Sequence, residues 1–366
     1  MDERISEHAE VLVDWSARIE AGDDVVVSVG EGAHDLAVAV ADALGTRGAN
    51  VVTTYASEEV QRAYLRAHDD EFELPEHELA LYEAADSVLF LGGTRNTAAT
   101  ADIPTETRQA YGRATKAVRE ARMDTDWVST VHPTRAMAQQ AGMSYEAYAD
   151  FVYDAILRDW EELADEMANM KEILDAGSEV RLVKEDTDLT MSIEGRTAVN
   201  SGASVVYDSH NLPSGEVFTA PVEDAVDGTV FFDVPMTLDG QRVENVHLTF
   251  DAGEVVEFSA GTGEEALAGI LDTDDGARRL GELGIGMNRG IDRFTDSVLF
   301  DEKMGDTVHL ALGRAYDACL PAGEDGNQSA VHVDMITDMS EESFIEVDGE
   351  VVQRNGTFRW EEGFVE

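Results

Sequence analysis

Five side chains in the second half of the chain have the chemistry of metal ligands. Glu216 and Glu282 are each a single acid in a segment of glycines, turn residues and apolar residues. His309 lies in the strand-like run HLALG, and the i, i+2 spacing of His332 and Asp334 places both on one face of a strand. A carboxylate in an apolar setting is costly unless a cation or metal pairs with it. Two imidazoles and three carboxylates are a ligand set for two borderline divalent ions.

Each of these residues also has an ordinary structural explanation. A strand histidine such as His309 is more often a hydrogen-bonded core residue than a ligand, and Glu216 could cap a turn. The H-x-D pattern is common. The five positions are spread from residue 216 to residue 334, so they predict one site only if an independent feature links their segments.

The order of four segments supplies that link: NLPSGEVFTAP, ELGIGMN, DEKMGDTVHLALG and HVDMI. In this order they resemble the M29 family of metallo-aminopeptidases. The segment TRAMAQQAGMSYEAYADFVYDA is similar to the helical segment that follows the first domain in that family. The resemblance therefore extends over essentially the whole chain.

The resemblance implies the identity of the site residues. It assigns two divalent ions (zinc, cobalt, manganese or magnesium) to the ligands Glu216, Glu282, His309, His332 and Asp334. The family tyrosine falls on Tyr316, although Asp317 follows it where the family has Pro. Glu302 and Lys303 match a further family segment, and we predict them as secondary site residues.

The resemblance also implies an activity, the removal of N-terminal amino acids from peptides by a metal-activated water. We expect Glu282 to be the general base, with Glu216 as the alternative, and Tyr316 to donate to the oxyanion. The family further implies a homodimer. The alternative from another class is a non-catalytic α/β protein that binds a small ligand and keeps the metal residues for structure.

The elements of the first third predict an α/β domain. Short β-branched runs at 24–29, 50–55, 87–91 and 127–131 alternate with helical patterns at 34–44, 57–67 and 105–121. Strands alternating with helices of this length indicate βαβ units and a doubly wound parallel sheet. A mainly helical region follows from 133 to 175. We predict an α/β domain at 1–135 and a helical connector at 136–177.

The remainder, 178–366, is predicted to be a mainly antiparallel α+β domain that carries the metal site. Short alternating segments are separated by turns such as Asp251-Ala252-Gly253. Helices are expected at 263–271 and 274–283.

A glycine motif, Gly30-Glu31-Gly32, follows the first predicted strand and invites a dinucleotide interpretation. The third glycine of the pattern would fall on Asp35, an acid that would oppose a pyrophosphate. We therefore expect a glycine turn in a nucleotide-free domain.

The charge balance excludes other classes. The 366 residues carry 76 acidic and 26 basic side chains, a net charge of −50, which disfavours nucleic-acid partners. Only four of the basic residues are lysines. An acidic, lysine-poor chain suits a salty cytosol, where the screening length falls to roughly 3 Å near molar ionic strength, so we expect a halophilic prokaryote. The single Cys319, the charged N-terminal segment and the lack of an apolar span predict a cytoplasmic protein without membrane contact.

Overall fold

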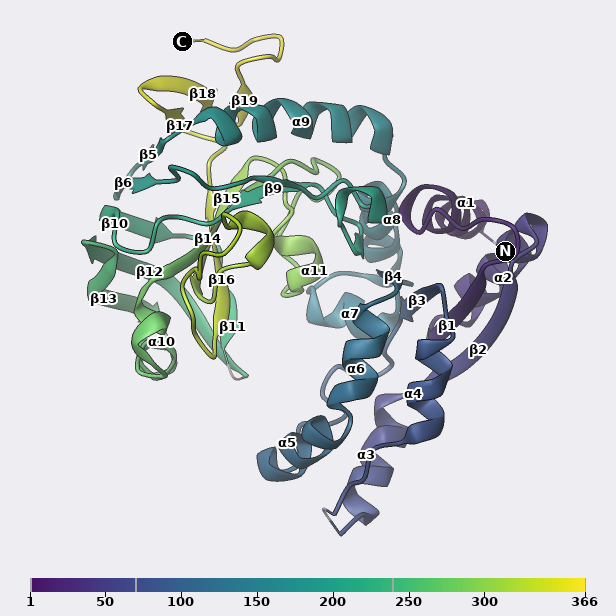
Figure 1. The fold of residues 1–366 in the computed structure, drawn as a ribbon. Helices are drawn as coiled ribbons and strands as arrows, with labels where there is room; N and C mark the ends of the chain where they lie inside the picture. Colours follow the sequence, from purple (N-terminus) through teal and green to yellow (C-terminus); the bar gives the residue numbers. More distant parts are fainter. Residues whose placement is uncertain (1, 70, 239, 366) are drawn as a thin grey trace. The chain divides into compact units, whose positions relative to one another are not determined.

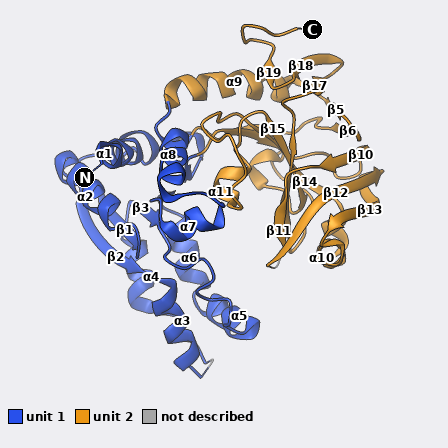
Figure 2. Cartoon of the chain, turned by 180° about the vertical axis from the view of Figure 1, so that it is seen from behind, with its two compact units in different colours: residues 1–158, 203–213 blue, residues 159–202, 214–366 orange. Residues whose placement is uncertain are grey.

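The computed structural model describes residues 2–69, 71–238 and 240–365. The chain forms two compact units (Figure 2): unit 1 contains residues 1–158 and 203–213, and unit 2 contains residues 159–202 and 214–366. The sequence-based division into 1–135, 136–177 and 178–366 stays a prediction.

Unit 1 is built on a five-stranded, entirely parallel sheet in the order β2-β1-β3-β4-β8 (Figure 1). The predicted α/β class is confirmed. The chain adds β2 on one side of β1 and β3 on the other, so the direction of winding reverses next to β1. The strands are β1 (Asp24–Gly30), β2 (Asn50–Ala56), β3 (Ser87–Gly92), β4 (Asp126–Val131) and β8 (Asn211–Leu212).

Helices connect these strands. They are α1 (Glu3–Glu10), η1 (Val11–Ser16), α2 (His34–Arg47), α3 (Glu58–Ala67), α4 (Glu76–Glu83), α5 (Thr105–Ala114), α6 (Lys116–Met123), α7 (Arg135–Gln140), α8 (Tyr145–Ile156) and η2 (Val205–Tyr207). The helical segment predicted at 105–121 is present, but as two helices, α5 and α6, because the helix breaks at Thr115. The Thr115 hydroxyl donates to the carbonyl of Tyr111 at 2.9 Å, a local bond that competes with regular helix.

Unit 2 contains two sheets, and every strand pair in them is antiparallel. This confirms the predicted class of the second half. The larger sheet has the order β11-β12-β10-β6-β5-β17-β18-β19, with β13 paired to β12. Its strands are β5 (Glu179–Lys184), β6 (Thr187–Ser192), β10 (Val226–Phe232), β11 (Met236–Leu238), β12 (Gln241–Asp251), β13 (Glu254–Thr262), β17 (Phe344–Val347), β18 (Glu350–Arg354) and β19 (Thr357–Phe358).

The smaller sheet of unit 2 has the order β16-β15-β14-β9-β7. Its strands are β7 (Val199–Asn200), β9 (Glu216–Thr219), β14 (Leu280–Gly286), β15 (Thr307–Gly313) and β16 (His332–Asp338). The helices of unit 2 are α9 (Trp160–Ala176), α10 (Glu264–Leu271), η3 (Asp275–Arg278), α11 (Val298–Asp301) and η4 (Asp317–Cys319).

The helix predicted at 274–283 is wrong. Only a short 3-10 turn forms at 275–278, and strand β14 begins at Leu280. All seven residues of β14 are buried, so the segment lacks the alternation of a half-exposed strand. Gly281, Gly284 and Gly286 disfavour helix and admit close neighbours instead.

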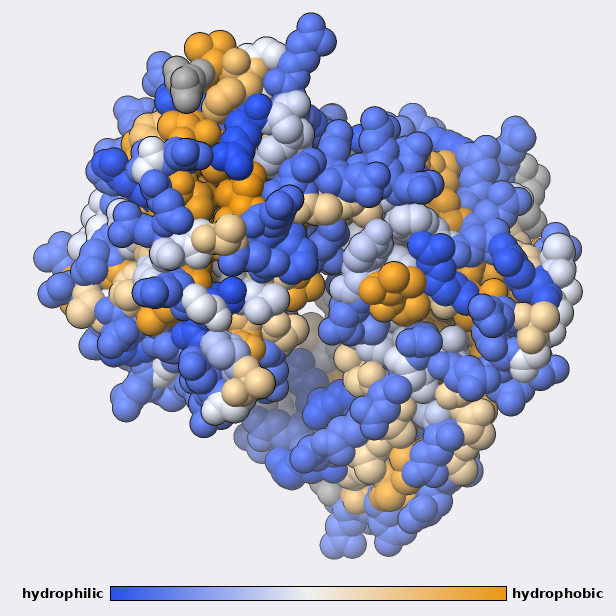
Figure 3. Space-filling view, turned by 45° about the horizontal axis from the view of Figure 1, so that its top comes forward, coloured by the Kyte–Doolittle hydropathy of each residue, from blue (hydrophilic) through white to orange (hydrophobic). Residues whose placement is uncertain are grey.

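The visible surface in Figure 3 is mostly hydrophilic, in keeping with the spread of acids along the chain. Among the described residues, no helix combines the length and the apolar character that crossing a membrane requires.

Candidate metal centre

The smaller sheet of unit 2 places the five predicted ligands on one face. Residues paired across an antiparallel sheet share a face, as do residues two apart along a strand. In the register, Glu282 pairs with Ala311, which in turn pairs with Asp334. His309 lies two residues from Ala311 on β15, and His332 lies two residues from Asp334 on β16. Glu216, on β9, pairs with Gly286 of the neighbouring strand β14. Four adjacent strands, β9, β14, β15 and β16, therefore supply the site.

Small residues separate the ligating side chains on this face. Gly284 lies directly opposite His309, and a Cβ on Gly284 would collide with the imidazole at Nε2. Ala311 lies between Glu282 and Asp334. The ring of His309 thus lies over the backbone of β14, in space that only glycine leaves open. A register shift next to Glu282 omits Gly281 from the pairing, a bulge that re-aims the neighbouring side chain.

The ligating atoms form two groups that share Glu282. In the first, Nε2 of His309 lies 3.2 Å from Oε1 of Glu282 and 3.5 Å from Oε2 of Glu216. In the second, Nε2 of His332 lies 3.3 Å from Oε2 of Glu282 and 3.5 Å from Oδ1 of Asp334. Within each group the ligating atoms lie within 4.8 Å of one another. Each carboxylate oxygen of Glu282 faces a different group.

The donor chemistry of the two groups fits divalent cations. Nδ1 of His332 donates to the carbonyl of Arg314 at 2.8 Å, which leaves Nε2 unprotonated in the neutral ring and directed at the carboxylates. Such a bond fixes the tautomer of a metal-ligating histidine. Imidazole nitrogen and carboxylate oxygen together suit zinc, cobalt or manganese.

Burial and mutual attraction set the electrostatics of the cluster. Glu216, Glu282 and His309 are respectively 7%, 4% and 1% exposed. Burial raises the pKa of Glu216, against the pull of Lys303 and His309. For Glu282, burial acts in the same direction but hydrogen bonds from His309 and His332 outweigh it, so its pKa is lowered. Burial also opposes the charged form of His332, yet Asp334 and Glu282 raise its pKa to about 10. The carboxylates of the cluster therefore stabilise a positive charge on the group beside them, as the raised pKa of His332 shows.

Lys303 is the buried cation of this region. It is fully buried, its Nζ lies 3.4 Å from Oε1 of Glu216, and it is ion-paired with Glu302. A buried lysine needs such partners, because an unpaired ammonium in the interior is strongly destabilising. Of the two residues predicted as secondary site residues, Lys303 therefore contacts Glu216 directly, and Glu302 is linked to it through Lys303.

Tyr316 lies at the open edge of the cluster. Its ring centroid is 4.9 Å from that of His332 and 5.7 Å from that of Phe218, and the side chain is about half exposed. Burial raises the pKa of its phenol, as do the charges of Glu282 and Asp334. The hydroxyl therefore stays protonated and available as a donor.

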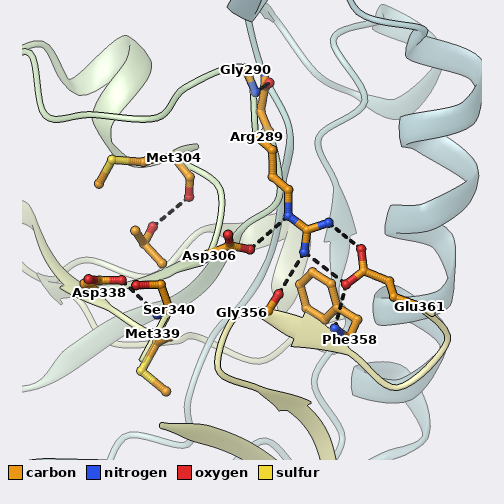
Figure 4. A network of polar contacts seen from close by, with 12 residues as sticks. Arg289, Gly290, Met304, Asp306, Asp338, Met339, Ser340, Gly356, Phe358 and Glu361 are labelled. Carbon is orange, nitrogen blue, oxygen red and sulfur yellow. Dashed lines mark hydrogen bonds and ion pairs between the residues drawn. The ribbon is translucent and has the colours of Figure 1, made fainter. Parts of the chain in front are cut away.

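Arg289, three residues beyond the end of β14, ties the surrounding loops together. Its guanidinium binds Asp306, the carbonyl of Gly356 and Glu361 (Figure 4). Asp306 immediately precedes β15, the strand that carries His309. Through these contacts Arg289 binds both the start of β15 and the C-terminal segment at 356–361.

Comparison with known proteins decides the family. The family model described as "Thermophilic metalloprotease (M29)" matches residues 1–358. This chain belongs to that family. Aminopeptidase T of Thermus aquaticus is 29% identical, over 95% of this chain and 94% of the relative. Aminopeptidase 2 of Geobacillus stearothermophilus is 32% identical over 57% of this chain and 58% of its own length.

The fold agrees with a solved structure of the family. Wild-type AmpT from Thermus thermophilus superimposes with a TM-score of 0.84 and 27% identity, and the match covers 98% of this chain and 99% of that one. The M29 protein described here is a hydrolase of the metallo-aminopeptidase class, as its sequence predicts.

The structure brings every sequence-predicted site residue into one region of unit 2; their individual roles stay predictions. Sequence reasoning missed the part played by the small residues. The signal was present in GELGIG, where glycine occupies alternate positions 284 and 286 on the same strand face as Glu282. Alternating glycines on a ligand-bearing strand indicate that large side chains from neighbouring strands cover them.

Proposed function

We propose that this M29 enzyme removes N-terminal amino acids from peptides at a site that holds two divalent ions. One ion would be held by Glu216, Glu282 and His309, and the other by Glu282, His332 and Asp334. The observation that supports this proposal is the position of Glu282, whose two oxygens face two separate donor groups. Zinc, cobalt, manganese and magnesium are the candidate metals.

When bound, such ions polarise a carbonyl and lower the pKa of water toward neutrality. The protein's residues do the rest. We assign Glu282 the transfer of a proton from the attacking water to the leaving amine, with Glu216 as the alternative base. Tyr316 donates a hydrogen bond to the oxyanion of the tetrahedral intermediate. Lys303 holds Glu216 in place by charge.

Metal analysis of the purified protein, joined to activity, tests the proposal. We expect two equivalents of divalent metal per chain, loss of aminoacyl-anilide hydrolysis after chelation, and recovery when zinc, cobalt or manganese is returned. One equivalent with full activity would contradict a two-ion site. Hydrolysis that survives complete removal of metal would contradict the metal-dependent mechanism altogether.

The proposal includes a setting for the enzyme. The net charge of −50 supports a halophilic source and a salt-rich cytoplasm, and the family resemblance supports a homodimer. Thermal unfolding across a salt series checks the first point, because a halophilic protein loses stability when salt is removed. Sedimentation at the same salt concentrations checks the second.

A further inference from the structure

Unit 1 contains a cavity that the metal centre does not use. Its volume is about 920 Å³, and the ends of β1, β2 and β3 line it at Gly30, Ala56 and Gly92. These are the carboxyl ends of parallel strands beside β1, where the direction of winding reverses. Ligands of open α/β sheets bind at this place in the fold. The volume lies in the range of small-molecule sites.

Aromatic rings form much of the wall. Tyr64 and Tyr111 line the cavity with ring centroids 6.2 Å apart, and Phe90 and Tyr55 line it from the sheet. The guanidinium of Arg122 lies over the ring of Phe90, 4.9 Å from its centroid. Planar groups stack favourably on such walls.

The helices α5 and α6 carry a net positive charge, unlike the chain as a whole. Residues 105–123 carry five basic and two acidic side chains, in a chain whose net charge is −50. Arg119 and Arg122 lie three apart on α6, which places them on one face of the helix, and both line the cavity. Within the described part of the chain neither forms an ion pair, and Nε of Arg122 is buried without a hydrogen-bond partner.

Acidic side chains line the cavity as well. The carboxylate of Glu31 is already engaged, accepting from the Ser57 hydroxyl and the Arg95 amide. Glu78 makes no ion pair with any described residue. Burial raises the pKa of Tyr82 and Tyr111. Arg122, which hydrogen-bonds the Tyr82 side chain, opposes the rise at Tyr82, and the charge of Glu78 adds to it at both tyrosines, so this carboxylate lies near the aromatic wall. Charged side chains of both signs, none of them ion-paired with a described residue, thus face the same space.

We propose that this cavity binds a zwitterionic amino acid or dipeptide with a planar side chain. Arg119 and Arg122 hold its carboxylate, Glu78 holds its ammonium group and the aromatic wall stacks on its ring. A phosphate-bearing ligand suits the cavity less well, because Glu31, Glu58 and Glu78 would repel a second negative charge. Free amino acids are the products that an aminopeptidase releases, so the inference rests on that activity for the source of the ligand.

Calorimetric titration of the metal-loaded enzyme with L-tryptophan tests the site. We expect saturable binding that weakens about tenfold or more in both Arg119→Met and Arg122→Met, since each removes a charge-assisted contact. Arg119 is exposed, so its variant keeps the fold even if Arg122→Met does not. Arg113→Met is the matched control: it removes one exposed positive charge from the same helical segment but does not line the cavity.

Two further titrations separate this site from other sources of binding. Glu282→Gln changes the metal centre and should leave tryptophan binding intact; loss of binding there would assign the heat to the metal centre and overturn the proposal. Adenosine monophosphate should bind more weakly than tryptophan. Tighter nucleotide binding, equal losses in the Arg113→Met control, or no tryptophan binding at all would each overturn the proposal.

Discussion

The two units use their sheets in opposite ways. In unit 2, five ionisable side chains lie on one face of an antiparallel sheet, mostly buried, and each is within 3.5 Å of another. In unit 1, the ionisable side chains of the cavity lie at the ends of parallel strands and on helices, and Arg119, Arg122 and Glu78 make no ion pair with a described residue. Paired, buried charges are interdependent, whereas separated, solvated charges act singly.

The difference follows from what surrounds each charge. Burying an unpaired carboxylate costs free energy, so the three acids of the metal centre require cations from the protein or from metal. At the cavity of unit 1, water reaches the exposed guanidinium of Arg119, whereas Nε of Arg122 is buried and has no hydrogen-bond partner for a ligand to displace. We therefore expect substitutions at the metal centre to change catalysis by large factors, and substitutions in unit 1 to change binding or stability by small ones.

The largest expected effect is at Glu282, the residue shared by both donor groups. Glu282→Gln removes one charge from both groups and removes the predicted base. Hydrolysis should fall by more than the roughly 10- to 100-fold that changes around metal ligands cause, and metal content should fall with it. Activity on an aminoacyl-anilide and metal analysis measure the two effects. Glu257→Gln, an exposed acid on β13 of the same unit, should behave as wild type. Near-normal rates in Glu282→Gln would end the assignment.

Tyr316 should have the next largest effect. Its hydroxyl stays protonated beside the cluster, so Tyr316→Phe removes one donor to the oxyanion and little else. We expect kcat to fall by about 10²- to 10³-fold, with KM and metal content little changed. Steady-state kinetics separate the two parameters. A rise in KM with kcat unchanged would make Tyr316 a substrate-binding residue instead. Tyr207→Phe, at a partly exposed tyrosine of unit 1 outside the proposed cavity, serves as the control.

The metal centre and the strands of unit 1 also show what the sequence can predict. The five ligands can be found because each lies in a short segment of unusual composition and the family resemblance supplies their order; they are Glu216, Glu282, His309, His332 and Asp334. The strands of unit 1 follow from β-branched runs. The structure of 274–283 does not, because a strand buried on both faces has no alternation and its apolar pattern equally suits a helix.

The close approach of residues across strands is also out of reach of the sequence. Whether a glycine faces empty space or an imidazole depends on register, which local pattern does not specify. Gly284 and Gly269 look alike in the sequence. Only in the fold does Gly284 lie against His309, whereas a methyl group added at Gly269 would meet no heavy atom within 4 Å.

That contrast gives the third prediction. Gly284→Ala places a methyl group in the space that the His309 ring occupies, so the ring must move off the strand. We expect activity and metal affinity to fall about 10- to 100-fold and stability to fall by about 1–3 kcal/mol from overpacking. Gly269→Ala on α10 should leave activity unchanged and raise helix stability by about 1 kcal/mol. Metal titration and thermal unfolding measure both variants; equal behaviour of the two would refute the close approach.

The smallest effect concerns a buried histidine of unit 1 that forms no ion pair with an acid among the described residues. His8 on α1 is fully buried, its Nε2 lies 2.8 Å from the hydroxyl of Thr130, and burial lowers its pKa to about 3. The unfolded chain, with a histidine pKa near 6.5, therefore binds a proton that the folded chain does not. Stability is fully present above pH 6.5 and falls as the pH drops toward 3, by about 2 kcal/mol between pH 7.5 and pH 5.

His8→Gln should remove this part of the pH dependence, because glutamine does not titrate. Urea titrations at pH 7.5 and pH 5, with the unfolding of α1 and β4 followed by hydrogen-exchange labelling at one fixed pH, measure it. His34→Gln, an exposed histidine at the start of α2, should keep the wild-type slope. An unchanged slope in His8→Gln would mean that His8 is charged in the folded protein. The contrast between the two units would then fail, because unit 1 would also bury a charged histidine. It would do so without carboxylates such as those that raise the pKa of His332 in unit 2.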